Sequence, residues 1–402
     1  MKLPRVALDF RWLDALCLCN GQHRYAVDLI RGLHEVRPEL QFVVLGSRPL
    51  AVPEIADVFS DFDRWQYQSV PRFIGTGALY REHARYQWLL RRLKIDLLHA
   101  LHSFVPVFPP VPVVETVYDM MLELFPEYRQ IVRSRDYRLH RWAFRKFAAR
   151  AIAISNTTAS DLERQWGFPR ERTDVVYLGG EPSSPVKKSI AEEVPMILAP
   201  YNLEPRKNLR SLLQGAAKLK GTGCKFRLVL FGRAAVNEDR ERQFGATIAQ
   251  LGLESCTELT GRIADRGLLK LYRTASVFVF PSVYEGFGLP VLEAMSAGAC
   301  VVAHNESAMA EVLGDAGWLV DMRSADAISG ALAAAMHCPA MGERAAVRAR
   351  QFSRERMAKE TVVVYGKALA LCPIRQLRYS EGLYGGARNR LPGRVAEDLG
   401  SD

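Results

Sequence analysis

The chain has 402 residues, enough for two or three domains that each bury a core. Its hydrophobic content of 49% and charged content of 24% are typical of a globular protein, and no apolar run approaches the ~20 residues that cross a bilayer. The net charge of +10 favours an acidic partner: a nucleotide diphosphate, an anionic lipid or nucleic acid. Seven scattered cysteines and the lack of an apolar leader after Met1 exclude a disulfide scaffold and predict a cytoplasmic protein.

Short apolar runs alternate with helical patterns along the first half of the chain. An amphipathic helix is expected from about residue 25 to 36, after a loop. The strands that we expect are 5–9, 42–45, 97–99, 113–117 and 151–154. This spacing of strands and helices predicts a doubly wound parallel sheet.

Two short motifs in this half have the residue types of a metal site. Asp61-Phe62-Asp63 has the Asp-x-Asp pattern that some transferases use for a divalent ion, but it is short and lies in a polar loop. His99 and His102 end a strand, whereas the paired histidines of metalloproteases lie on a helix with a glutamate between them. We therefore expect no metal and no cofactor.

The stretch 129–150 is strongly basic. Its apolar side chains Ile131, Trp142, Phe144 and Phe147 predict a cationic amphipathic helix. The basic residues are Arg129, Arg133, Arg135, Arg138, Arg141, Arg145, Lys146 and Arg150. Such a helix binds an anionic membrane or is simply a solvated face, and both interpretations remain open. The first would place the protein at the inner face of the membrane.

A linker is expected around residues 183–195, which contain proline and paired lysines and show no apolar periodicity. Asn156, which lies before it in a glycosylation sequon, is expected to cap a helix instead. The strands expected after the linker are 196–199, 227–231, 257–259, 277–280 and 300–303. They predict a second Rossmann-like domain, although the dinucleotide fingerprint and the Walker loop are both missing from the sequence.

The domains are thus predicted as 1–182, 183–195 for the linker, and 196–352. A helix at 353–372 is expected after them, followed by a tail, 373–402, rich in glycine and arginine. With little to bury, this tail is expected to be disordered.

The stretch 279–295 organises the second domain. Its strand is a continuous apolar run, as in strands buried on both faces, and it ends at Pro281. Pro290 suits the first position of a helix that Gly298 would end after about two turns. We therefore predict a helix N-terminus at the carboxyl end of a parallel sheet, which is a site for anions, with Glu285 and Glu293 beside it.

Tyr284-Glu285-Gly286-Phe287-Gly288-Leu289-Pro290, with Glu293 eight positions after Glu285, resembles the signature of retaining glycosyltransferases of family 4, which have the GT-B fold. Weaker similarity extends from residue 5 to about 370. The resemblance implies two Rossmann-like, doubly wound parallel-sheet domains facing a cleft, with the acceptor on the first and a nucleotide-sugar donor on the second. It also implies metal-independent transfer of a sugar to a saccharide or lipid-linked acceptor, with GDP-mannose as the first guess for the donor.

The resemblance assigns roles around the donor. The second glutamate, here Glu293, would hydrogen-bond the ribose, and Glu285 would contact the donor sugar, since carboxylates accept hydrogen bonds from hydroxyls. An arginine and a lysine usually bind the diphosphate; Lys207 holds the lysine position but Asn202 stands at the other, so we expect Arg206 to replace the arginine. The donor-binding residues expected are Gly21, Glu285, Gly286, Phe287, Gly288, Leu289, Glu293 and Arg233. The catalytic residues expected are Arg206, Lys207, Glu285 and Asp119.

The first domain departs from the family pattern at two positions. Many members have Gly-Ile-Gly-Arg-Tyr where this chain has Gly21-Gln22-His23-Arg24-Tyr25, so His23 replaces a glycine. A family segment with histidine before aspartate corresponds to Tyr118 and Asp119, and tyrosine does not titrate near neutral pH. The acceptor-side candidates are His23, Arg24, Tyr118 and His102.

Two alternatives remain open. The first is a nucleotide-sugar epimerase or a phosphorylase-like enzyme of the same fold, and incubation with donor alone separates these because an epimerase changes the sugar without any acceptor. A non-catalytic GT-B partner protein is the second, motivated by His23 and Tyr118. A nucleic-acid-binding protein would account for the charge but for none of the motifs, so no nucleic acid is expected as a partner.

Overall fold

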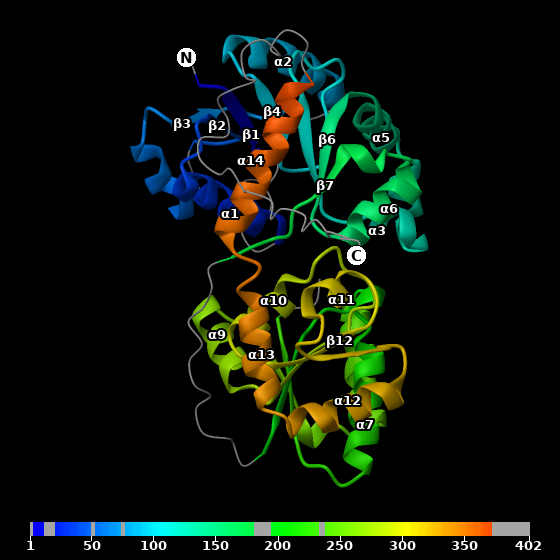
Figure 1. Ribbon diagram of the computed structural model, residues 1–402. Coiled ribbons are helices and arrows are strands. Elements are labelled where there is room, and N and C mark those ends of the chain that lie inside the picture. The colour runs from blue at the N-terminus through cyan, green and yellow to red at the C-terminus, as the bar shows by residue number, and fades with distance from the viewer. Residues whose placement is uncertain are drawn as a thin grey trace, which may run out of the picture.

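The structure, a computed structural model, describes residues 3–11, 21–49, 53–73, 77–180, 194–232 and 238–371. They form two α/β domains, one above the other in Figure 1. The first sheet has seven strands in the order β3-β2-β1-β4-β5-β6-β7, and the second has six in the order β10-β9-β8-β11-β12-β13. All neighbouring strands pair in parallel, which confirms the predicted doubly wound fold class.

The central strands agree with the sequence prediction because they are apolar runs buried on both faces. In the first sheet the strands are β1 (Arg5–Asp9), β2 (Gln41–Gly46), β3 (Trp65–Ser69), β4 (Leu97–Ala100), β5 (Val113–Val117), β6 (Ala148–Ala153) and β7 (Thr173–Val175). In the second they are β8 (Met196–Pro200), β9 (Arg227–Phe231), β10 (Thr257–Gly261), β11 (Val277–Phe280), β12 (Cys300–His304) and β13 (Trp318–Val320). The prediction misses β3, β7 and β13, which are edge strands and are short or partly polar.

Helices cover both faces of each sheet. Those of the first domain are α1 (Gly21–Val36), α2 (Ala78–Arg92), α3 (Met121–Leu124), α4 (Arg129–Arg133), α5 (Arg135–Phe147) and α6 (Asn156–Trp166), with 3-10 turns η1 (Pro53–Ser60), η2 (Pro126–Tyr128) and η3 (Arg170–Arg172). Those of the second are α7 (Leu209–Gly221), α8 (Glu238–Gln250), α9 (Asp265–Thr274), α10 (Leu289–Ser296), α11 (Ala308–Leu313), α12 (Ala325–Met336) and α13 (Ala340–Ala349), with η4 (Pro205–Lys207) and η5 (Glu254–Cys256). In the described part of the chain, none of the helices is long and apolar enough to cross a bilayer.

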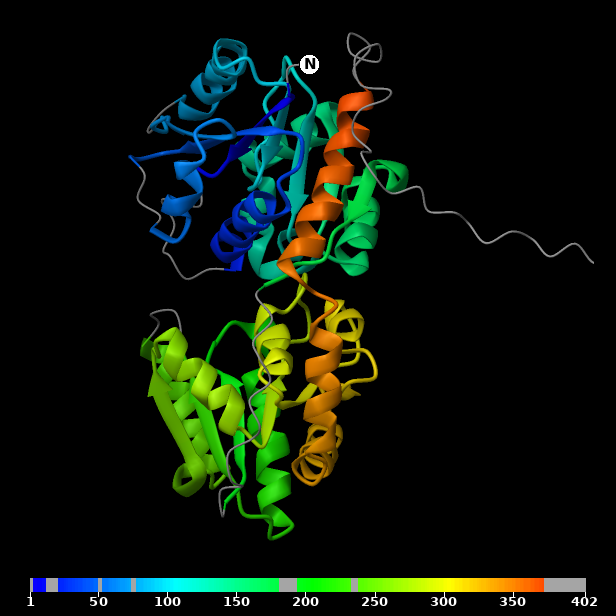
Figure 2. The ribbon, with the colours of Figure 1, turned by 60° about the vertical axis from the view of Figure 1, so that its left-hand side comes forward.

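The last helix, α14 (Arg354–Ala370), returns to the first domain and lies along α1 (Figures 1 and 2). The hydroxyl of Tyr365 in α14 is hydrogen-bonded to His99 of β4 at 2.7 Å. Gly180 and Ser353 form an isolated β-bridge, so the two chain segments that run between the domains lie side by side. A Cβ atom on Gly179 would lie 2.2 Å from the Ser353 carbonyl oxygen, which leaves room for glycine alone.

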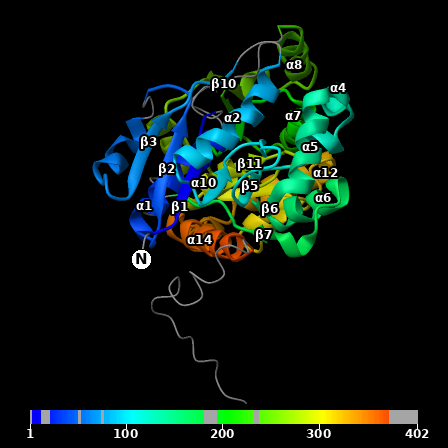
Figure 3. The ribbon, with the colours of Figure 1, turned by 90° about the horizontal axis from the view of Figure 1, so that it is seen from above.

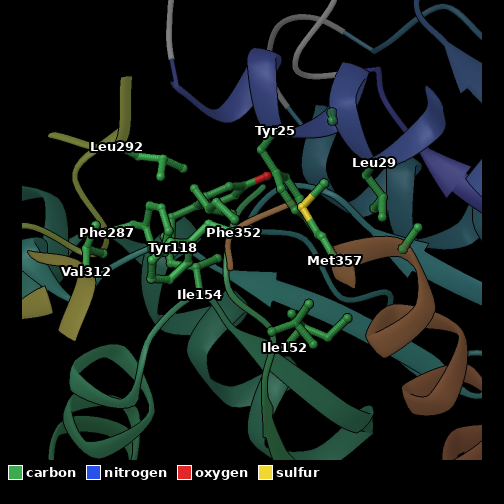
Figure 4. Packing of buried hydrophobic residues seen from close by; sticks show 14 of the residues in the cluster. Tyr25, Leu29, Tyr118, Ile152, Ile154, Phe287, Leu292, Val312, Phe352 and Met357 are labelled. Carbon is green, nitrogen blue, oxygen red and sulfur yellow. The ribbon is translucent and has the colours of Figure 1, made fainter. Parts of the chain in front are cut away.

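The hydrophobic core is continuous from one domain to the other. One cluster of buried residues includes Tyr118 and Ile154 of the first domain together with Phe287 and Val312 of the second. Figure 4 shows these side chains gathered around the domain junction, with Phe352 beside them. The two domains are therefore packed against each other at one end of the cleft.

Three expectations about the first domain need correction. The stretch 129–150 is not a single helix: α4 and α5 are separated by Ser134, which caps α5, and the stretch ends in β6. Phe144 does not lie on an exposed face but is fully buried in the core. Ser155, rather than Asn156, caps α6. Most of the predicted linker, and the predicted tail after residue 372, lie outside the described residues.

Candidate active site

Two loops of the second domain are hydrogen-bonded to each other at the carboxyl end of its sheet. They are η4 and the loop between β11 and α10, and the amide of Val283 donates to the Arg206 carbonyl at 2.9 Å. Asn208, in the left-handed conformation (φ 54°) that asparagine tolerates, donates from its side chain to the carbonyls of Pro281 (3.3 Å) and Met322 (2.6 Å). These bonds fix Arg206 and Lys207 beside the signature stretch.

Glu285 is the centre of a charged cluster. Its Oε1 atom accepts hydrogen bonds from Lys207 Nζ (2.5 Å), Arg206 (3.1 Å) and the Ser282 hydroxyl (2.5 Å). Burial alone would raise the pKa of the Glu285 carboxyl, but the charges of Lys207 and Arg206 outweigh it and hold that pKa below its usual value. Arg206 also forms an ion pair with Glu204 at 3.0 Å, so two cations and two carboxylates are gathered at this position.

The signature stretch docks directly on the first domain. A Cβ atom on Gly286 would lie 1.8 Å from the Tyr118 carbonyl oxygen, so only glycine permits this approach. The Tyr284 hydroxyl donates to Asp161 of α6 at 2.8 Å and accepts from the Met120 amide at 3.2 Å. This docking brings Asp119 close enough to Arg206 and Lys207 of the second domain to interact with their charges. Burial raises the pKa of its carboxyl, an effect that the charges of Arg206 and Lys207 oppose.

The N-terminus of α10 lies beside this cluster. Gly288 caps the helix in a left-handed conformation (φ 93°), where a Cβ atom would also lie 2.2 Å from the end of Met309. Pro290 is the second residue of the helix rather than the first, and Gly298 follows its end with φ 80°, as predicted. Pro290 has no amide proton, and the amides of Val291 and Leu292 donate to the Gly288 carbonyl. The dipole of this helix end therefore contributes the local environment that favours an anion.

Glu293, on the first turns of α10, faces α1 of the first domain. One of its oxygens forms an ion pair with Arg24, and the other accepts from the Tyr272 hydroxyl at 3.2 Å. A cavity of about 420 Å³ adjoins this contact and is lined by α1, α9, α10 and Phe352. Helix α1 begins at Gly21, so Gly21 and Arg24 lie in its first turn and not in the expected loop.

The chain matches two family models in succession. Glycosyltransferase Family 4 covers residues 19–183 and Glycosyl transferases group 1 covers residues 181–352. The chain is also 30% identical over 373 residues to the O-antigen chain mannosyltransferase B of Escherichia coli, an alignment that spans 86% of this chain and 96% of the relative. The chain belongs to the family 4 glycosyltransferases. As a member it is an enzyme, a hexosyltransferase.

A further relative and two solved structures are similar to the chain. The MMP alpha-(1->4)-mannosyltransferase of Mycolicibacterium hassiacum is 29% identical over 229 residues, 54% of each chain. A sucrose-phosphate synthase from Thermosynechococcus elongatus superposes with a TM-score of 0.72 at 19% identity, covering 92% of this chain and all of that one. HepE from Anabaena in complex with UDP gives 0.69 at 18% identity, with 90% and 100% covered. These structures show that the glycosyltransferase has the GT-B fold.

Three acceptor-side candidates of the glycosyltransferase are buried in its first domain. The His23 ring packs against Phe10, with ring centroids 5.4 Å apart, and is 4% exposed. His102 lies 3.5 Å from the buried carboxylate of Asp9. The Tyr118 hydroxyl donates to the Leu101 carbonyl at 2.6 Å, and its ring belongs to the core. Arg24 is therefore the member of this group that the structure places at the cleft, while Arg233 of the donor group lies outside the described residues.

Sequence reasoning missed a domain contact made by Glu311 of α11. Its carboxylate accepts from the amides of Asn156 (2.8 Å) and Thr157 (2.7 Å) at the N-terminus of α6, and from the Tyr177 hydroxyl (3.0 Å). A carboxylate at a helix N-terminus is favoured by the exposed amides and the helix dipole. The one signal in the sequence is that the first turn of α6 has no acidic residue of its own.

The Asp-x-Asp motif lies away from the charged cluster. Asp61 and Asp63 precede β3 and so belong to the amino-terminal edge of the first sheet, whereas the cluster lies where the carboxyl ends of the strands meet. Among the residues that the structure describes, no group of histidine, cysteine and acidic side chains is arranged to hold a metal ion.

Proposed function

We propose that this glycosyltransferase moves a hexose from a nucleoside-diphosphate sugar to a saccharide acceptor, with mannose from GDP-mannose as the donor to test first. The observation that carries the proposal is the convergence of Arg206 and Lys207 on Glu285 beside the N-terminus of α10. Two adjacent cations beside a helix N-terminus suit a diphosphate. The choice of mannose and of a saccharide acceptor is supported by the name of the Escherichia coli relative.

In the proposed reaction the diphosphate leaves with negative charge and no metal assists it. Arg206 and Lys207 stabilise that charge as the bond between the sugar carbon and the phosphate oxygen breaks. The departing phosphate oxygen takes the proton of the acceptor hydroxyl, whose oxygen attacks the same face of the sugar, so the configuration is retained. No protein carboxylate is then needed as a nucleophile, in contrast to retaining glycosidases.

The carboxylates have binding roles in this proposal. Glu285 accepts hydrogen bonds from hydroxyls of the donor sugar, and its low pKa keeps it ionised. Glu293 accepts from the ribose hydroxyls of the nucleotide. Asp119, buried on the acceptor side and close enough to interact with Arg206, faces the transferred sugar. The amides that follow Glu285, from Gly286 to Leu289, meet the sugar and the phosphates.

The experiment that tests the proposal has two steps. Thermal shift with GDP-mannose, GDP-glucose, UDP-glucose and UDP-galactose identifies the donor, because a ligand that binds the folded state raises the melting temperature. The donor found is then incubated with saccharide acceptors, and NMR of the product gives the anomeric configuration. Inversion at the transferred carbon would contradict the mechanism. A sugar changed without any acceptor would identify an epimerase instead.

An anionic membrane is part of the same proposal as a partner of residues 129–150. Helices α4 and α5 expose six of the eight basic side chains, namely Arg129, Arg133, Arg135, Arg138, Arg145 and Lys146. They also expose Ile131 (47%) and Trp142 (44%), while Phe144 is buried. A basic face with exposed apolar side chains suits the surface of an anionic bilayer.

A further inference from the structure

Aromatic side chains from three separate segments lie at the same end of the first sheet. The Trp142 ring lies edge-on to Phe147, 5.4 Å between centroids, and Phe147 packs against Phe108 at 4.9 Å. The carbonyls of Val107 and Phe108 accept hydrogen bonds from Gln87 of α2, the neighbour of Trp88. In Figure 3, where the molecule is seen from above, α2 and α5 both lie on the side that faces the viewer. We call Trp88, Phe108, Trp142 and Phe147 the aromatic ridge.

Three of the four rings of the ridge project into solvent, while Phe147 is partly buried. Phe108 is 70% exposed, Trp88 55% and Trp142 44%, although burial of such rings is one of the main sources of folding stability. It lies at the amino-terminal edge of the first sheet, because Phe108 precedes β5 and Phe147 precedes β6. The ridge is therefore at the opposite edge of this sheet from the active site.

Phe108 is held in an unfavourable backbone conformation. Its φ is +50°, in the left-handed region that bulky residues avoid, and two prolines follow it. Beyond its contact with Phe147 the ring gains little burial from this arrangement. Strain that brings an apolar ring into solvent indicates a role outside the fold of the domain.

Cations surround the ridge on both sides. Arg91, Arg92 and Lys94 lie at the end of α2, and the Arg92 guanidinium is 4.7 Å from the centre of the Trp88 ring. On the other side a hollow of about 660 Å³ is lined by Trp142 and several basic residues, with no carboxylate among its lining residues. The basic residues lining it are Arg138, Arg141, Arg145, Lys146 and Arg172. We call Arg91, Arg92, Lys94, Arg138, Arg145 and Lys146 the basic rim; in the described part of the chain none of these six pairs with a carboxylate.

We infer that the aromatic ridge inserts into the headgroup region of an anionic bilayer while the basic rim contacts the lipid phosphates. The inference rests on the proposed membrane partner. It places the membrane contact on the aromatic ridge and the basic rim, which include residues of α2 and Phe108, and not on α4. Tryptophan and phenylalanine rings next to arginine and lysine are the side chains that occupy the boundary between headgroups and acyl chains. Six cations without acidic partners match the continuous negative charge of a leaflet better than a protein surface of mixed charge.

The inference is tested by flotation of the full chain with vesicles of phosphatidylcholine, with and without phosphatidylglycerol. Wild type should float with the anionic vesicles, and this should fade at high salt. Trp88→Gln and Phe108→Asn should each lower the association by about tenfold, the effect expected when one ring is no longer buried. Asparagine tolerates a positive φ, so Phe108→Asn should keep or raise the melting temperature. Phe62→Asn, at a phenylalanine 79% exposed outside the ridge, is the matched control and should float like wild type.

Three outcomes would overturn the inference. The first is equal flotation of wild type and both ridge variants, and the second is equal binding to neutral vesicles. The third is lipid-free association of wild type that Phe108→Asn abolishes, which would make the ridge a contact between copies of the chain. Because the ridge lies away from the cleft, transfer to a soluble saccharide should be unchanged in both variants. Failure of that transfer in wild type would count against the proposed reaction and not against the ridge.

Discussion

Arg24 of the first domain and Glu293 of the second are joined by an ion pair across the cleft, and Tyr272 donates to the second oxygen of the same carboxylate. The group proposed to hold the ribose is thus engaged before any donor binds. Ribose hydroxyls and the Arg24 guanidinium are all donors and compete for the same acceptor oxygens. If Glu293 holds the ribose as proposed, donor binding should loosen this contact between the domains.

Replacing Arg24 should strengthen nucleoside binding. Arg24→Gln removes the competitor for Glu293, and because the Arg24 side chain is 56% exposed we expect only about a twofold to fivefold gain, in the range of exposed ion pairs. Calorimetry with guanosine and uridine isolates the ribose contact from the phosphates. Arg31→Gln, on the same helix but paired with Asp57, should leave the affinity unchanged. Weaker nucleoside binding by Arg24→Gln would show that Arg24 is itself a ligand of the donor.

The two signature glutamates should separate binding from turnover. Glu293→Ala should weaken binding of the nucleoside diphosphate by about 1.5–3 kcal/mol, the range for hydrogen bonds to a charged group. Glu285→Ala should mainly lower kcat, since it contacts the transferred sugar and fixes Arg206 and Lys207. The measurements are calorimetric affinity and steady-state kinetics on both variants. Unchanged nucleotide affinity in Glu293→Ala would rule out the ribose assignment.

Arg206 and Lys207 should act as one unit. Each alanine variant should lose about 10²-fold or more in turnover, as when a donor to a developing charge is removed. The double variant should lose much less than the product, because both side chains act on one charge. Asn202→Ala is the control: its side chain accepts from the Glu204 amide at 2.9 Å and only shapes the turn. A near-wild-type rate for Arg206→Ala would leave Arg233 as the next cation to test.

Transfer should not depend on a divalent ion. The proposed site neutralises the diphosphate with side-chain cations and a helix N-terminus, so EDTA should leave the rate unchanged. The assay compares initial rates of transfer after dialysis against EDTA and after addition of Mn²⁺ or Mg²⁺. Activity lost with EDTA and restored by Mn²⁺ would make Asp61 and Asp63 the first candidates for metal ligands.

Stability should fall as the pH drops below about 6.5. Burial lowers the pKa of His99 from 6.5 to about 3, so below pH 6.5 the unfolded chain takes up a proton that the folded chain does not. At pH 5 this single group should cost about 2 kcal/mol of unfolding free energy. Urea unfolding between pH 7 and pH 5 measures the slope, which should be smaller in His99→Gln. An identical slope in the variant would contradict the assignment.

The fold was predictable where burial dominates the sequence pattern. Continuous apolar runs such as those of β11 and β12 allowed the parallel sheets to be predicted. Gly298 marked a helix end because a left-handed residue at that position is usually glycine. Three of the four edge strands, β3, β7 and β13, escaped prediction because they are short or carry polar residues on partly exposed faces. Tyr118 is an example of what pattern alone missed: only the folded chain shows that its hydroxyl is bound within the core.

The site was predictable only within single segments. Glu285, Gly286 and Gly288 stand in one string whose turn chemistry can be recognised. Contacts between distant segments are absent from any local pattern, so the pairing of Arg24 with Glu293 and the contact of Glu311 with α6 could not be foreseen. Such pairs depend on how the two domains meet, which is set by tertiary packing.

The return of α14 to the first domain has a consequence for how the chain is made. This helix is translated after the whole second domain, yet Tyr365 lies in the core of the first and Arg354 pairs with Asp28 of α1. The first half therefore leaves the ribosome with part of its apolar surface uncovered, and it stays so until the last helix arrives. Synthesis that stops before Arg354 should yield an aggregation-prone product, although every residue of the proposed donor site would already be present.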